Sequence, residues 1–169
     1  AAMEAAGLPV AKGSSEPISD EIVASELAEE IGYPVIIKAA AGGGGIGMQI
    51  VEEESQFASA LKLCMSRAKS AFGDERVFVE KYIQGAQHVE FQVLADGKNA
   101  IHFGERFCSI QRRHQKLVEE GPWLSDDKRS EIGDLVCKGA ESVGYKGLAT
   151  FEFLRDSNGD FYFLEVNPR

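Results

Sequence analysis

The middle of the chain carries a run of basic side chains with no acidic residue among them: Arg112, Arg113, His114 and Lys116. Charges of one sign repel at this spacing, and the chain has a formal net charge of −9, so the run contrasts with the composition. Arginine presents a planar fork of donors that matches phosphate or carboxylate, and lysine adds a compact charge. The run therefore predicts an anion-binding site. A solvated basic strand or turn is the alternative.

A glycine run precedes it, between two segments that read as short strands. Residues 42–45 are all glycine, and Lys38 lies just before them. Ordering four glycines is costly, and the cost makes sense if backbone N–H groups close around phosphate oxygens. A strand follows the run, which excludes a dinucleotide-binding helix, and no Gly-Lys-Ser/Thr closes it as in a P-loop. We expect a glycine flap over a nucleotide, with Lys38 on the phosphates; a flexible linker is the alternative.

Two glutamates near the end of the chain are predicted to face each other in a hairpin. Asn158-Gly159 is typical of a two-residue turn, because both residues tolerate a positive φ. That turn sets Glu152 opposite Glu165 and Thr150 opposite Asn167. Like charges in this position destabilise a sheet, and a hard cation such as Mg²⁺ removes the repulsion. Two solvent-exposed glutamates are the alternative.

Hydrophobic periodicity indicates the elements that must position these groups. We expect helices over residues 19–32, 55–72 and 125–144, and strands over 34–38, 48–51, 77–83, 148–155 and 161–166. Alternation of apolar and polar residues over 88–93 predicts one more strand, which turns at 95–98 into a strand at 100–103. We expect Ser19 to cap the first helix, and the residues expected to face inward include Ile22, Val23, Phe72 and Val143. These elements predict an α+β protein.

The composition sets limits on function. A length of 169 residues suits one domain, or one and part of another. No apolar run approaches the ~20 residues of a membrane span. The acidic charge argues against nucleic acid as a partner. Three cysteines without a C-x-x-C pair fit reduced thiols in an intracellular compartment, not a disulfide framework or zinc site.

In these residues and their order, the chain resembles the ATP-grasp domain of biotin carboxylases over essentially its whole length. The matching segments are 36–38, the glycine run through Met48, 80–82, 88–90, 92–94, 111–116 and 163–169. The block Gln-Arg-Arg-His-Gln-Lys at 111–116, followed by Val-Glu-Glu at 118–120, is the most specific. The chain departs from the family at Ile46, Phe107 and Gly121, where a basic residue, Asp and Ala are usual.

The resemblance implies an ATP-dependent ligase, in which ATP and bicarbonate form carboxyphosphate and its CO₂ passes to N1′ of biotin. The substrates and cofactors implied are ATP, Mg²⁺ or Mn²⁺, bicarbonate, and biotin on its carrier. The partners implied are a biotin carboxyl carrier protein or domain and a carboxyltransferase, as in acetyl-CoA or propionyl-CoA carboxylase, with no nucleic acid or membrane. The full-length protein is expected to be a homo-oligomer in the cytoplasm, or in the mitochondrial matrix of a eukaryote. The alternatives are another carboxylate ligase of the carbamoyl-phosphate-synthase type and a nucleotide-binding module without chemistry.

The resemblance also implies roles by position. Contacts to the ATP phosphates and ribose are expected from Lys38, Gly44, Gly45, His88 and His114. The hinge strand that holds adenine is expected at Glu80, Lys81, Tyr82 and Ile83. The metal ligands, of which the two glutamates also belong to the nucleotide site, are expected to be Glu152, Glu165 and Asn167. The catalytic residues, which hold bicarbonate and stabilise developing charge, are expected to be Lys116 and Arg169.

The same resemblance implies an organisation into subdomains. Residues 1–9 would end a linker helix, 10–83 would form the small α/β lid subdomain with the glycine loop, and 84–169 would form part of the larger antiparallel subdomain. The family's N-terminal subdomain is expected before Ala1, and its bicarbonate-deprotonating Gln-Val-Glu-His segment after Arg169. We therefore expect this piece to be inactive alone.

Overall fold

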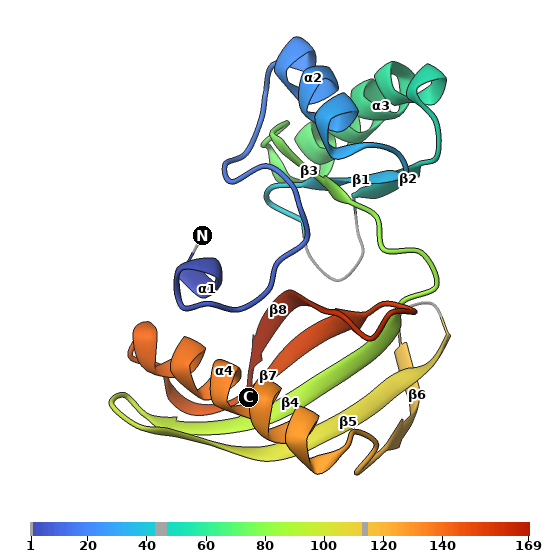
Figure 1. Cartoon of the computed structure of the whole chain (residues 1–169). Coiled ribbons are helices and arrows are strands. Elements are labelled where there is room, and N and C mark those ends of the chain that lie inside the picture. The colour runs from blue at the N-terminus through green and yellow to red at the C-terminus, as the bar shows by residue number, and fades with distance from the viewer. Residues whose placement is uncertain (1, 43–46, 113–114) are drawn as a thin grey trace. The chain divides into compact units, whose positions relative to one another are not determined.

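The computed structural model describes residues 2–42, 47–112 and 115–169 (Figure 1). The contacts divide the chain into two compact units, one of residues 11–82 and one of residues 1–10 with 83–169. Each unit contains an antiparallel sheet with helices against it, which confirms the α+β prediction. Among the described residues, no helix has the length and apolar character that crossing a bilayer requires.

The unit of residues 11–82 is a three-stranded sheet covered on one face by two helices (Figure 1). Its strands run in the order β2-β1-β3 and are β1 (Val35–Ala39), β2 (Met48–Val51) and β3 (Val77–Lys81). Its helices are α2 (Glu21–Ile31) and α3 (Glu54–Phe72). Alternate residues of β1 are buried, so Val35 and Ile37 enter the core, while Ile36 and Lys38 lie on the open face.

The start of α2 differs from the prediction. Asp20, not Ser19, caps the helix, since its carboxylate accepts the N–H groups of Ile22 and Val23. Ile22 and Val23 are therefore in the first turn, where their side chains are 70% and 49% exposed. The prediction that they face inward was wrong, and Ala24 and Ala28 make the helix contact instead.

Two other apolar residues were also predicted on the wrong side. Phe72 is the last residue of α3, and Val143 is the C-cap of the later helix α4 (Asp126–Ser142). Both side chains are more than one third exposed. Residues at a helix end have fewer neighbours to cover them than residues within it, and helical periodicity takes no account of this.

The second unit is a five-stranded antiparallel sheet in the order β6-β5-β4-β7-β8, with α4 along one face (Figure 1). Its strands are β4 (Gln87–Asp96), β5 (Ala100–Arg112), β6 (Gln115–Glu120), β7 (Lys146–Arg155) and β8 (Phe161–Pro168), and a short helix, α1 (Ala2–Ala5), completes the unit. Val89, Phe91 and Phe153 are fully buried against α4. The same alternation leaves the polar residues of β4 on the opposite face.

The β7–β8 hairpin confirms the predicted register through a different turn. Glu152 pairs with Glu165 and Thr150 with Asn167, as predicted. The Asp156 N–H donates to the Asp160 carbonyl, so residues 157–159 form the loop. This loop is one residue longer than the expected two-residue turn. A register shift beside Glu152, where Leu164 is the extra residue of β8, compensates for the longer loop.

Candidate functional site

Charged side chains form a row across four adjacent strands, on the sheet face opposite α4. Arg106 of β5 pairs with Glu90 of β4, Glu90 with Glu152 of β7, and Glu152 with Glu165 of β8. Two carboxylates of the row are buried, since Glu90 is 1% and Glu152 4% exposed. Three neighbouring acids repel one another, so the burial of Glu90 and Glu152 requires cations close by.

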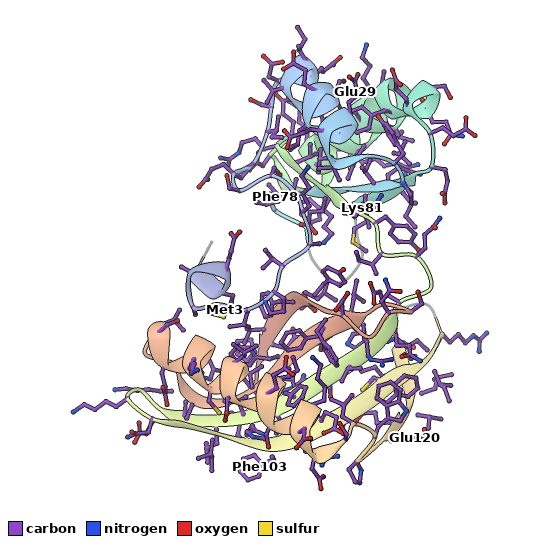
Figure 2. All side chains as sticks on the ribbon, viewed as in Figure 1. Met3, Glu29, Phe78, Lys81, Phe103 and Glu120 are labelled. Atoms are coloured by element: carbon purple, nitrogen blue, oxygen red, sulfur yellow. The ribbon has the colours of Figure 1, made fainter. Side chains whose placement is uncertain are left out.

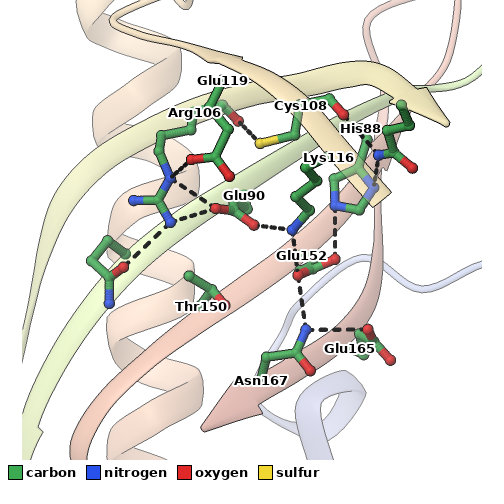
Figure 3. A network of polar contacts seen from close by, with 12 residues as sticks. His88, Glu90, Arg106, Cys108, Lys116, Glu119, Thr150, Glu152, Glu165 and Asn167 are labelled. Atoms are coloured by element: carbon green, nitrogen blue, oxygen red, sulfur yellow. Dashed lines mark hydrogen bonds and ion pairs between the residues drawn. The ribbon is translucent and has the colours of Figure 1, made fainter. Parts of the chain in front are cut away.

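Lys116 supplies one of these cations from the edge strand β6. Its ammonium donates to Glu152 Oε1 at 2.7 Å and also contacts Glu90 Oε2 (Figure 3). Arg106 supplies the other, because its Nε donates to Glu90 Oε1 at 2.8 Å. Lys116 of the predicted basic run therefore meets Glu152 of the predicted carboxylate hairpin in one cluster.

His88 approaches Glu152 from β4. Its Nε2 lies 2.7 Å from Glu152 Oε2, close enough for strong attraction, although the contact is not aligned as a hydrogen bond. The other ring nitrogen, Nδ1, lies 3.1 Å from Gln111 Nε2. The Gln111 amide donates, so Nδ1 accepts and the proton of the ring is on Nε2, facing the carboxylate.

These contacts set the charge states. Burial by itself would raise the pKa of Glu152, but His88 and Lys116 together lower this pKa to about 2. Burial likewise opposes the charge of Lys116, but Glu152 and Glu90 raise the pKa of Lys116 above its ordinary value. At neutral pH the carboxylate is therefore an anion and the lysine a cation.

Asn167 connects the two predicted metal-binding glutamates. Its Nδ2 donates to Glu152 Oε1 at 2.8 Å and to Glu165 Oε1 at 3.1 Å (Figure 3). Two carboxylate oxygens from different strands thus converge on one amide, whose other polar atom is also an oxygen. A half-turn of that amide would exchange its nitrogen for its oxygen at the same point. The three residues fit a hard cation of the Mg²⁺ type, which prefers oxygen ligands.

Among the described residues, two other groups have ligand atoms within 4.8 Å of one another: His88, Glu90 and Glu152, and Glu90, Cys108 and Glu119. Glu90 is engaged by Arg106 and Lys116, so its oxygens are already neutralised. Glu152 belongs to the first of these groups and to the set with Glu165 and Asn167. The set with Glu165 and Asn167 is the better candidate for a metal site, because Glu165 is exposed and has no basic partner in the contacts described for it.

Arg169 lies on the same sheet face. Its Nη2 donates to Thr150 Oγ1 at 3.0 Å, and its backbone N–H donates to the Leu148 carbonyl. Thr150 is fully buried and pairs with Asn167. The second predicted catalytic residue is thus anchored next to the strand that carries Glu152.

The unit of residues 11–82 carries the other predicted nucleotide residues. Lys38 donates to Glu80 Oε2 at 2.5 Å on the open face of the sheet. Apolar side chains surround this pair in register: Ile36, Met48, Ile50 and Phe78 (Figure 2 labels Phe78). The face therefore combines a flat apolar surface with one ammonium group.

The remaining predicted residues have other surroundings. The Lys81 ammonium donates to the carbonyls of Gly32 and Tyr33, so its side chain supports the chain turn before β1. Tyr82 and Ile83 follow the end of β3, and the Tyr82 N–H donates to Pro34. Gly44, Gly45, Ile46 and His114 lie outside the described residues.

Sequence reasoning missed several members of the site, above all Glu90 and Arg106. The alternation over 88–93 placed Glu90 on a polar face, but it did not indicate which strand lies beside it. The pairing of β4 with β7 joins residues about 60 positions apart, and no local pattern reports such a contact. The contacts of Gln92 and Gln111 with neighbouring strands were missed for the same reason, whereas Thr150 lies opposite Asn167 as predicted.

Known proteins are similar to this chain in sequence and fold. The family model of the carbamoyl-phosphate synthase L chain, ATP binding domain, matches residues 1–169. A biotin carboxylase of Allochromatium vinosum is 50% identical over 173 residues, which cover 100% of this chain and 38% of that protein. A pyruvate carboxylase component of Methanothermobacter thermautotrophicus is 52% identical over 170 residues, which cover 99% of this chain and 34% of that protein.

A solved structure agrees in fold. It is the biotin carboxylase domain dimer of the Hydrogenobacter thermophilus 2-oxoglutarate carboxylase, in complex with MgADP, ADP and bicarbonate. The match has a TM-score of 0.93 at 45% sequence identity and covers 99% of this chain and 38% of that one. The chain thus spans little more than a third of the length of the relatives it matches.

Proposed function

The chain belongs to the family of the carbamoyl-phosphate synthase L chain ATP-binding domain, and from this we propose that it forms the ATP- and metal-binding part of a biotin carboxylase. In the proposed reaction, ATP and bicarbonate form carboxyphosphate, and the carboxyl group passes to N1′ of biotin. The observation that carries the proposal is the buried Glu152, which pairs with Glu165 and is contacted by Lys116 and Asn167.

The metal in this proposal is Mg²⁺ or Mn²⁺, held by Glu152, Glu165 and Asn167. A bound divalent ion neutralises phosphate charge, which is most of what a phosphoryl-transfer site must do. Lys116 and Arg169 are fixed cations on the same sheet face, and we assign to them the binding of bicarbonate and the stabilisation of charge on the transferred group.

Each of the two units carries residues that this proposal assigns to the nucleotide. Residues 10–83 are the lid subdomain and 84–169 part of the large subdomain, supported by the compact unit of residues 11–82. The open face around Lys38 suits an adenine base beside a phosphate charge. The phosphate and ribose contacts are assigned to Lys38, Gly44, Gly45, His88 and His114, and the adenine hinge to residues 80–83.

The proposed partners are a biotin carboxyl carrier protein or domain and a carboxyltransferase. The names of two relatives support this class, since one belongs to a pyruvate carboxylase and the other to a 2-oxoglutarate carboxylase. Because these two enzymes differ in acceptor, the proposal does not specify one. The latter domain forms a dimer in its crystal, which supports a homo-oligomer. We propose a cytoplasmic location, and these relatives lend no support to a mitochondrial one.

The test is ADP formation by the complete subunit, measured with and without bicarbonate and free biotin. We expect bicarbonate-dependent ATP use that biotin stimulates, with carboxybiotin as product. Ammonia-dependent formation of carbamoyl phosphate would instead establish the carbamoyl-phosphate-synthase type. ATP binding without bicarbonate-dependent ADP formation would establish a module without chemistry.

A further inference from the structure

We propose that Glu90, aligned by Arg106, is a positioning residue that holds the Lys116 ammonium in place for the reaction. This inference rests on the proposed function and deepens it, because it explains how a flexible lysine keeps one position. It concerns an acid whose described ion pairs are with Arg106 and Lys116, neither of which is assigned above to metal or nucleotide.

Both oxygens of Glu90 are occupied by basic groups. Oε1 accepts from Nε of Arg106 at 2.8 Å and also from its Nη2, and Oε2 accepts from Lys116 (Figure 3). With its side chain almost completely buried, Glu90 has no oxygen left to offer a substrate. Its chemistry is therefore exerted through its two partners.

Arg106 is itself held from several sides. Its Nη2 also donates to Gln92 Oε1 at 3.3 Å, and its Nε lies 3.2 Å from the Glu119 carboxylate. The strand register pairs it directly with Glu90. A planar guanidinium fixed in this way orients the Glu90 carboxylate, and the remaining oxygen of that carboxylate is aimed at Lys116.

A purely structural role explains this arrangement poorly. Removing charges from water is costly, and buried ion pairs are often no more stabilising than apolar side chains of similar volume. A core built for stability alone would place an apolar pair here. The buried charges of Glu90 and Arg106 are explained if their role is to fix the position of the Lys116 ammonium.

The two anchors of Lys116 are not equivalent. Glu152 is shared among Lys116, His88 and Asn167, and it is a proposed metal ligand. Glu90 contacts Arg106 and Lys116 and has no part in the metal set. An ion on Glu152 would compete with Lys116 for its negative charge, whereas the contact with Glu90 would persist. A lysine side chain is flexible, so its ammonium keeps one position only if at least one of its ion-pair partners stays in place.

The experiment compares Glu90→Gln with Glu131→Gln in the complete subunit. Glu131 is an exposed acid on α4 that pairs with Lys128, and α4 lies on the other face of the sheet. We expect Glu90→Gln to lower kcat for bicarbonate-dependent ATP use on the order of 100-fold, with KM for MgATP within about threefold of wild type. Glu131→Gln should stay within about twofold in both. Unchanged kcat in Glu90→Gln would overturn the inference.

A double-mutant cycle separates positioning from an independent role. If Glu90 acts through Lys116, the double variant Glu90→Gln/Lys116→Met should be no slower than Lys116→Met alone. Losses that multiply in the double variant would overturn the inference while leaving the proposed function intact. A wild-type subunit without bicarbonate-dependent ATP use would overturn both.

Glu90→Asp covers the case in which Glu90→Gln fails to fold. This variant keeps the carboxylate but shortens the side chain by one methylene. The Lys116 ammonium must then shift toward the carboxylate or lose the contact. We expect a cooperative thermal transition close to that of wild type together with a clear loss of kcat. A wild-type kcat in Glu90→Asp would contradict the inference.

Discussion

The ammonium of Lys116 contacts Glu90 and Glu152, and their negative charge raises the pKa of Lys116 against the opposing effect of burial. It therefore remains a cation well above neutral pH. A fixed cation stabilises negative charge that develops beside it as the reaction proceeds. Its contribution is expected in the transition state more than in nucleotide binding.

Replacing Lys116 tests this expectation. Lys116→Met in the complete subunit should lower kcat by about 100- to 1,000-fold, while the Kd for MgATP changes by less than about threefold. Steady-state kinetics and nucleotide titration give the two values. Lys128→Met is the matched control, because Lys128 pairs with Glu131 on the helix α4, outside the site. Equal losses in kcat and affinity would show that Lys116 mainly binds nucleotide.

The sequence allowed some of these side chains to be placed near one another, but not all of them. Glu152, Glu165 and Asn167 could be placed together because one hairpin turn lies between them. Glu90 and Arg106 could not, because their contacts depend on the order of strands that are distant in sequence. The roles of all these residues in binding stay predictions.

Helix α4 is tied to the sheet by a buried ion pair. Glu105 of β5 accepts from Arg129 Nε at 2.7 Å and from the backbone N–H groups of Trp123 and Leu124. Burial opposes the charge of Glu105, but the Arg129 and backbone donors lower the pKa of Glu105 to about 2. Glu105 therefore binds a proton less readily in the folded state than in the unfolded chain, where its pKa is near 4.5.

Glu105→Gln should lower the free energy of unfolding by about 2 to 3 kcal/mol at pH 7. Because the folded pKa is depressed, the difference from wild type should be complete above about pH 5 and shrink as the pH falls toward 2. Urea unfolding at several pH values measures it. Glu131→Gln, an exposed acid on α4, should show little difference at any pH. A Glu105→Gln deficit that persists at pH 2 would refute the assignment.

The β7–β8 hairpin depends on its loop for register. Gly159 has φ +93°, a conformation that side chains disfavour, and an added Cβ would lie 3.1 Å from the Arg155 guanidinium. Gly159→Ala should lower the free energy of unfolding by about 1 to 2 kcal/mol. Ser157→Ala in the same loop is the control and should change it by less than about 0.5 kcal/mol. Chemical denaturation checks both; no effect of Gly159→Ala would contradict the loop geometry.

This hairpin also shows where local reasoning reaches its limit. The facing glutamates were predicted correctly, but from a two-residue turn that is not present. The extra loop residue and the extra β8 residue cancel, so the predicted pairing survived the wrong turn. Likewise, both Ser19 and Asp20 are good caps, and sequence alone chose the wrong one of two neighbours.

Across the chain, two separate apolar cores support the two units. Their elements were largely predictable because short strands and amphipathic helices carry clear periodicity. The roles assigned to the two units rest on family resemblance alone and stay predictions, since Lys38 and Glu152 lie far apart in sequence. The glycine run and His114, which lie outside the described residues, stay predictions.

The central claim is that the facing carboxylates of β7 and β8 hold the divalent ion of the ATP site. Mn²⁺ binding to the complete subunit with ADP, followed by electron paramagnetic resonance, tests it most directly. We predict that Glu165→Gln, an exposed substitution that leaves the fold intact, weakens Mn²⁺ binding about 10- to 100-fold, while Glu131→Gln leaves it unchanged. Equal Mn²⁺ affinity in Glu165→Gln and wild type would contradict the claim.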